Sequence, residues 1–229
     1  MQPWHAHVFS VVSKATQTAV EKIIYENLFL TSRERAWDRK TRRLDFPQTA
    51  VIEKILPTFQ SRSTNFFAAT VKNVLFDVYA SDDRDVIELI LKKCTGIRIL
   101  AYWIYDSDLA GPWILSSAHT LECFWVTAEV FEEALVNCQV VLPALKKMHL
   151  TDLDEHWQEH VEFVISIAPN LQYMLLRGEP WYLEDIEEWM EGRSDTFTIE
   201  LQDDSSDSED DVNFLHEWLL TIGANIPIQ

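Results

Sequence analysis

A short apolar pattern recurs at nearly constant spacing, and this repeat constrains the fold more than any other feature. Five segments read apolar-x-x-apolar-x-apolar, and they begin at Val71, Ile97, Leu121, Leu145 and Leu171. Successive starts are 26, 24, 24 and 26 residues apart. A sixth segment starts another 26 residues on, with Phe197, Ile199 and Leu201 alternating. A regular period of a few tens of residues is typical of repeat architectures, so we expect one strand in each unit.

Helical patterns fill most of the intervals between these strands. The apolar spacing predicts helices over residues 85–94, 130–141, 157–167 and 183–190. The connection 104–118 is less clearly helical, because Gly and Pro interrupt it. Strand, helix and strand at this period imply right-handed crossovers and a parallel sheet. The sequence therefore predicts an α/β fold, a leucine-rich-repeat-like solenoid with parallel strands and helices, preceded by short N-terminal helices.

Charge and composition exclude several classes of function. The formal net charge is −18, which disfavours binding to the phosphates of nucleic acids, and the basic run 33–43 is interrupted by acids. No glycine-rich phosphate loop is present among the five glycines. The three cysteines are widely spaced and favour free, mostly buried thiols rather than a metal cage or a redox pair. We expect no cofactor and no membrane span, and a cytoplasmic or nuclear location, because no signal peptide or long apolar run is evident.

The first part of the chain carries a resemblance to a known family. Residues 7–28 have helical spacing, and within them Val11-Val12-Ser13-Lys14 and Ile23-Ile24-Tyr25 resemble the second half of an F-box. Residues 66–74, 94–97 and 142–145 are similar to a large fungal group of F-box proteins with degenerate leucine-rich repeats. The opening Leu-Pro and first helix of an F-box have no counterpart before His5.

This resemblance implies a domain order and a partner. It divides the chain into a helical F-box remnant over 1–45, a connecting segment over 46–70 and the repeats over 71–229. In that family the F-box binds a Skp-type adaptor of a cullin ubiquitin ligase, and the repeats hold the substrate. The residues that it assigns to adaptor binding are Val11, Val12, Ile23, Ile24 and Tyr25.

Strand alternation indicates where a partner protein would bind. If the fourth and sixth repeat positions face the core, the third, fifth and seventh line the concave side of the sheet. Trp, Tyr and Arg are frequent anchors of protein interfaces. The candidate partner-binding residues on that side are Trp103, Trp125, His149, Tyr173 and Arg177. The alternative is that the 104–118 connection or the N-terminal helices cover these side chains.

One string has the spacing of a catalytic zinc motif. His156-Trp157-Gln158-Glu159-His160 matches HxxEH, in which two histidines on one helical face bind zinc. The competing interpretation is a solvated helix face that links two strands. We expect that second reading, and no enzyme and no metal site, with a zinc-dependent hydrolase kept as the alternative.

An acidic tract lies near the C-terminus. Residues 203–211 read DDSSDSEDD, which is typical of a disordered, solvated loop. Ser205, Ser206 and Ser208 precede acids, as acid-directed kinases prefer, so we predict them as phosphorylation sites. Residues 212–222 are amphipathic and are expected to form a closing helix over the last repeat. The overall prediction is a protein-interaction module, either a substrate receptor of a ubiquitin ligase or a stand-alone repeat scaffold without adaptor binding.

Overall fold

The computed structural model describes the sheet and most of the helices that pack on it. The described residues are 14–31, 49–78, 84–104, 117–131, 140–191, 193 and 196–203. All statements about structure below concern these residues.

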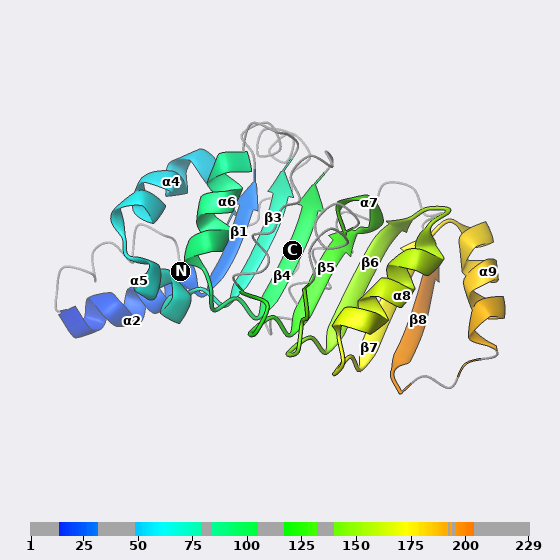
Figure 1. Ribbon diagram of the computed structural model, residues 1–229. Helices are drawn as coiled ribbons and strands as arrows, with labels where there is room; N and C mark the ends of the chain where they lie inside the picture. Colours follow the sequence, from blue (N-terminus) through cyan, green and yellow to red (C-terminus); the bar gives the residue numbers. More distant parts are fainter. Residues whose placement is uncertain are drawn as a thin grey trace, which may run out of the picture.

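A parallel sheet organises the described part of the chain. Its eight strands are β1 (Asn27–Thr31), β2 (Thr49–Val51), β3 (Asn73–Val78), β4 (Ile99–Ile104), β5 (Cys123–Thr127), β6 (Lys147–Leu153), β7 (Tyr173–Gly178) and β8 (Thr198–Asp203). They lie in the order β2-β1-β3-β4-β5-β6-β7-β8, and every neighbouring pair is parallel. From β3 to β8 the spatial order therefore follows the chain (Figure 1). β2 lies on the outer side of β1.

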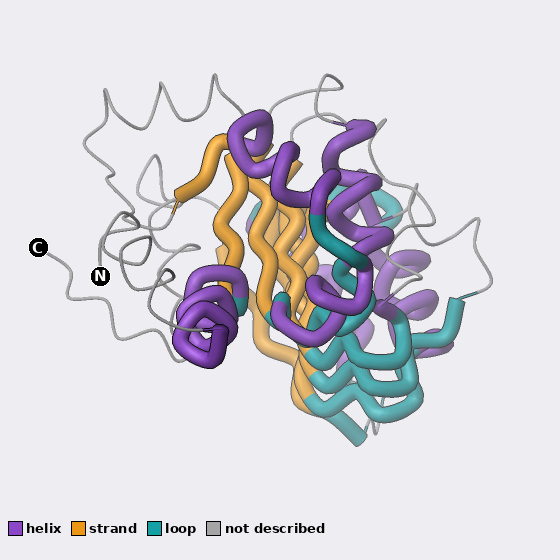
Figure 2. The backbone as a smooth tube through the Cα atoms, turned by 90° about the vertical axis from the view of Figure 1, so that its left-hand side faces the viewer, coloured by secondary structure: helices purple, strands orange, loops and turns teal. Residues whose placement is uncertain are grey.

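Helices connect the strands and lie mostly on one side of the sheet, as the edge-on view shows (Figure 2). They are α2 (Lys14–Tyr25), α4 (Ile52–Ser61), α5 (Thr64–Thr70), α6 (Arg84–Lys93), α7 (Ala128–Phe131), α8 (Trp157–Ile167) and α9 (Pro180–Met190). Among the described residues, no helix is long and apolar enough to cross a bilayer.

Alternating strand residues build the main core. We call the side of the sheet that meets the helices the core face. Its strand side chains are Leu28 and Leu30 of β1 with the residues at the same register in β3 to β7: Val74, Phe76, Leu100, Tyr102, Phe124, Val126, Met148, Leu150, Met174 and Leu176. They form one cluster with buried helix residues such as Ile87, Ile90 and Val161. Such burial of apolar surface is the dominant favourable term in folding.

A repeated backbone contact sets the spacing of the units. The carbonyl oxygen of the residue before β1, and of the residue before each strand from β3 to β6, accepts hydrogen bonds from two amides of the next unit. Glu26 O accepts from the amides of residues 72 and 73 at 3.0 Å each. The same pair of bonds recurs at the carbonyls of residues 72, 98, 122 and 146, with distances of 2.7 to 3.2 Å. We call this series the carbonyl ladder. It places the side chains at equivalent repeat positions next to one another along one edge of the sheet.

The sequence predicted most of this arrangement. The α/β class and the parallel strands are confirmed, and the sixth strand expected near Phe197 is β8. The helices expected over 85–94, 157–167 and 183–190 are α6, α8 and α9. Of the helix expected over 130–141, α7 contains the first two residues, and residues 132–139 lie outside the described part.

The N-terminal region differs from the expectation. Residues 27–31 were expected within helical segments, but they form β1, which pairs with β3 over five residues. The connecting segment 46–70 holds β2, α4 and α5. The helical pattern ends at Tyr25, and the apolar run that follows it, NLFLT, is short enough for a buried strand. Residues 27–31 thus belong to the same sheet as the repeats, and α2 leads directly into them.

Candidate functional site

The side of the sheet away from the core face carries a row of aligned side chains. We call this side the opposite face; its central row consists of Phe29, Leu75, Ala101, Trp125, His149 and Leu175. The Trp125 ring stacks on the His149 ring, with centroids 3.6 Å apart and planes inclined by 12°. Tyr173 lies on the other side of His149, with a centroid distance of 5.6 Å. Three of the candidate partner-binding residues are therefore brought together.

These side chains are covered within the chain itself. Trp125 is 1% exposed, His149 7% and Arg177 6%. Tyr173 is half-buried, and its hydroxyl donates to Glu200 Oε2 at 2.8 Å. Trp103 lies in β4 at the register of Asp77, and its side chain is outside the described part. A partner protein cannot contact Trp125, His149 or Arg177 while they are buried in this way.

His149 sits in an environment that keeps its imidazole neutral. Burial lowers its pKa to about 3, and the nearby Lys147 charge acts in the same direction. Its Nδ1 atom is buried and has no hydrogen-bond partner. A neutral, enclosed ring in an aromatic stack favours a packing role.

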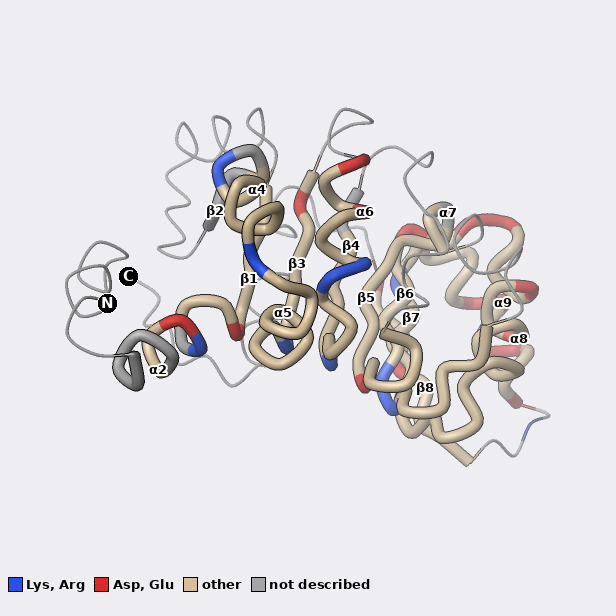
Figure 3. The backbone as a smooth tube through the Cα atoms, turned by 60° about the vertical axis from the view of Figure 1, so that its left-hand side comes forward, with Lys and Arg blue, Asp and Glu red and all other residues tan. Residues whose placement is uncertain are grey.

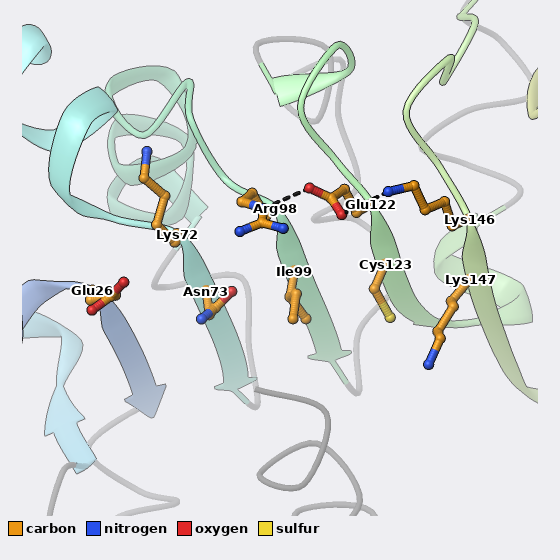
Figure 4. Close-up of a pocket in the computed structure, with 9 residues that line it drawn as sticks. All are labelled: Glu26, Lys72, Asn73, Arg98, Ile99, Glu122, Cys123, Lys146 and Lys147. Carbon is orange, nitrogen blue, oxygen red and sulfur yellow. Dashed lines mark hydrogen bonds and ion pairs between the residues drawn. The ribbon is translucent and has the colours of Figure 1, made fainter. Parts of the chain in front are cut away.

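A pocket opens at the amino ends of the strands, beside the buried row. It encloses about 390 Å³. Glu26 and four residue pairs at strand beginnings line it: Lys72 and Asn73, Arg98 and Ile99, Glu122 and Cys123, Lys146 and Lys147. We call it the amino-end pocket (Figure 4). The carbonyl ladder creates it, because the first residue of each pair occupies a ladder position.

A line of alternating charges crosses the amino-end pocket. Arg98 Nε donates to Glu122 Oε1 at 2.6 Å, and Lys146 Nζ donates to Glu122 Oε2 at 3.2 Å. The hydrogen bond from Arg98 lowers the pKa of Glu122, with a smaller contribution from Lys146, and that same bond raises the pKa of Arg98. These three side chains lie across β4, β5 and β6, whereas Lys147 points the same way as Ile99 and Cys123 (Figure 4).

The charge of the amino-end pocket opposes that of the whole chain. Four of its lining residues are basic and two are acidic, a formal charge of +2, whereas the chain carries −18. Figure 3 shows basic positions along the amino ends of the strands, while acidic positions gather around α8 and α9. An anionic group is therefore attracted to this edge more than to the acidic surface around α8 and α9.

The residues assigned to adaptor binding are partly described. Val11 and Val12 lie outside the described residues, and Ile23 lies in α2 with its side chain outside them. Ile24 is 41% exposed, and Tyr25 packs edge-on against Phe66 and Phe67. The phosphorylation candidates Ser205, Ser206 and Ser208, and the closing helix expected over residues 212–222, also lie outside the described residues.

The HxxEH string does not lie on a solvated helix face throughout. His156 is exposed at the start of α8, but His160 is 2% exposed and its ring meets Phe131 edge-on at 6.2 Å. The fourth residue along a helix returns to the same face only if both residues are helical, and His156 precedes the first turn. Within the described part of the chain no cluster of three metal-ligating side chains is present. The geometry does not favour a zinc site on this pair.

Two of the cysteines behave as the sequence indicated. Cys94 and Cys123 are free and buried. Burial raises the pKa of both thiols, that of Cys123 to about 11. Cys138 lies outside the described residues. Neither described thiol is a ready nucleophile, since the thiolate is the reactive form.

Sequence reasoning missed the amino-end pocket, although the signal was available. The ladder positions 72, 98, 122 and 146 repeat with the strand period, and all four carry charged residues. A comparison of every repeat position, rather than of the strand positions alone, would have found them. No protein-family model, curated protein or solved structure matches this chain.

Proposed function

We propose that the chain is a protein-interaction scaffold built as a leucine-rich-repeat-like solenoid. The strands from β3 onward begin at residues 73, 99, 123, 147, 173 and 198 and lie side by side in that order. Each unit contacts the next through the hydrogen bonds of the carbonyl ladder and through apolar side chains of the core face. Repeat proteins of this kind present an extended surface in which neighbouring units each contribute equivalent side chains.

The observation that carries this proposal is the amino-end pocket. It is lined by one or two residues at the start of each of five strands. Which residues line it therefore depends on the register of the repeats and not on a single loop. It is open, charged and close to the half-buried Ile99. The opposite face supplies a packed support behind it, because Trp125 and His149 are buried there.

Site-specific crosslinking tests the scaffold proposal. A photoreactive benzoyl-phenylalanine at Ile99 is expected to give a discrete crosslinked protein in cells, whereas the same group at the exposed Gln60 of α4 is not. The captured protein, purified separately, is expected to form a 1:1 complex with the unmodified chain in size-exclusion chromatography. Equal crosslinking at both positions, or no complex between purified proteins, would contradict the proposal.

A substrate receptor of a ubiquitin ligase is the second candidate. The resemblance of Ile23-Ile24-Tyr25 to part of an F-box favours it, and the exposed side chain of Ile24 on α2 leaves that position accessible to another protein. Tyr25 packs against Phe66, and β1 begins two residues later at Asn27. Helix α2 is therefore joined to the sheet and does not form a separate helical domain. The chain mixed with a purified Skp-type adaptor is expected to elute as a 1:1 complex that Ile24→Asp abolishes. Separate elution at micromolar concentrations would leave the stand-alone scaffold.

A further inference from the structure

We propose that the amino-end pocket binds an extended acidic segment of a partner protein. This inference rests on the scaffold function and adds the chemistry of the ligand. Its first support is the charge of +2 on a chain of −18, which directs negatively charged groups to this edge.

Glu122 shows what kind of group the pocket holds. Its two carboxylate oxygens take one hydrogen bond each from Arg98 and Lys146. The pocket thus already contains one carboxylate of its own between two cations. A second carboxylate, supplied by a partner, would find donors of the same kind beside it.

Two cationic groups retain donors for such a ligand. Arg98 contacts Glu122 through Nε, and a guanidinium has further donors on its two terminal nitrogens that fit a carboxylate in bidentate fashion. Lys147 is exposed and points with Ile99 and Cys123 (Figure 4). Between Arg98 and Lys147 lie the half-buried Ile99 and the buried Cys123, a surface for apolar or small side chains of the same segment.

The spacing of the cations fits an extended chain. Arg98 is the residue before β4, and Lys147 is the first residue of β6, two strands away. Neighbouring strands are separated by ~4.8 Å, so the two backbone positions are ~10 Å apart. Alternate side chains of an extended peptide lie on the same side ~7 Å apart, and the long Lys and Glu side chains cover the remaining difference. Acidic residues at positions i and i+2 therefore match the pair. A nucleic acid fits less well, because its continuous phosphates would also meet the acidic remainder of the surface.

A direct binding measurement tests this inference. The probe is a fluorescein-labelled twelve-residue peptide of alternating Glu and Thr, and its matched control replaces every Glu by Gln. Fluorescence anisotropy with the full chain is expected to show binding of the Glu peptide that weakens with added salt, and none of the Gln peptide. Equal binding of both peptides, or tighter binding of a single-stranded RNA of the same length, would overturn the acidic-segment assignment.

Charge variants locate the site. Lys147→Glu is expected to weaken binding about tenfold, whereas Lys54→Glu, which makes the same charge change on exposed α4, changes it less than about twofold. Glu122→Gln is expected to strengthen binding about threefold, because Arg98 and Lys146 then lose their internal carboxylate. Equal losses for Lys147→Glu and Lys54→Glu would show a general charge effect and overturn the site.

The two proposals fail in different ways. If crosslinking at Ile99 captures a partner that forms a 1:1 complex, but acidic peptides do not bind, the scaffold stands and the acidic-segment inference falls. A thermal unfolding midpoint unchanged from that of the parent chain, measured for each variant, separates lost binding from lost folding.

Discussion

The two faces of the sheet are both buried along their middle, yet they differ in chemistry. The core face carries Leu, Val, Phe, Met and a single Tyr at equivalent positions from β1 to β7. The central row of the opposite face runs from Phe29 through Trp125 and His149 to Leu175, and the imidazole of His149 is neutral and has no hydrogen bond at Nδ1. The core face is uniform because every unit must cover the same helix-facing layer. The opposite face varies from unit to unit, so its packing differs along the sheet and has to be tested position by position.

The largest expected effect tests the core face. Phe124 is 0% exposed within the main cluster. Phe124→Ala is expected to lower the free energy of unfolding by about 3–5 kcal/mol, because it removes buried apolar contacts and leaves a cavity. Chemical denaturation measures this change, with Val141→Ala at a 55% exposed position as the control. A loss below about 1 kcal/mol would mean that the ring is not closely packed.

The second-largest expected effect tests a close contact between two backbone segments on the helix side of the sheet. Gly96 lies in the turn before β4, where an added Cβ would stand 2.1 Å from the carbonyl oxygen of Ala68. That atom belongs to backbone and cannot turn aside, so Gly96→Ala is expected to cost about 2 kcal/mol or more. The paired control is Ala69→Gly, at an exposed position of α5 that tests local helix propensity alone, with a cost of about 1 kcal/mol. A neutral Gly96→Ala in thermal unfolding would contradict the close approach.

A pH measurement tests the opposite face. The imidazole of His149 has a folded-state pKa of about 3 against an ordinary value of 6.5. Between these values the unfolded chain takes up a proton that the folded chain does not, so this group makes stability fall as the pH is lowered below 6.5. From pH 6.5 to pH 5 its contribution is expected to drop by about 1.6 kcal/mol.

The variant His149→Phe isolates that contribution. It keeps an aromatic ring against Trp125 and removes the titrating group. The stability difference between parent and variant is expected to change by about 1.6 kcal/mol over this range, in favour of the variant at the lower pH. Parallel pH curves for the two proteins would refute the enclosed, neutral histidine.

The smallest effect belongs to the exposed edge between the faces. Glu122→Gln removes both ion pairs, whose members are partly exposed, so the expected loss is about 0.5 kcal/mol and diminishes in high salt. Urea denaturation at low and high ionic strength measures it. A loss of unfolding free energy above about 2 kcal/mol would mean that Glu122 is needed mainly for folding. It would contradict the interpretation of Glu122 as a carboxylate that occupies the place of a ligand in the pocket.

The sequence pattern predicted the repeated strands of the fold but not the amino-end pocket. The period and alternation located β3 to β8 and separated the core face from the opposite face, because both depend on spacing along one chain. The interpretation of residues 1–45 as helical missed β1, since a five-residue apolar run has too little periodicity to separate strand from helix. Strand alternation placed Trp125, His149 and Tyr173 beside one another, and the burial of Trp125 and His149 agrees with the alternative in which other parts of the chain cover these candidates.

The sequence by itself determined which side chains share a face, because a strand alternates its side chains whatever surrounds it. Only the tertiary structure decided that β1 and β2 join the sheet ahead of β3 and that His149 is enclosed. It also brought Arg98, Glu122 and Lys146 together across three strands. Burial and charge pairing depend on contacts between residues far apart in the chain, so a local sequence pattern does not predict them.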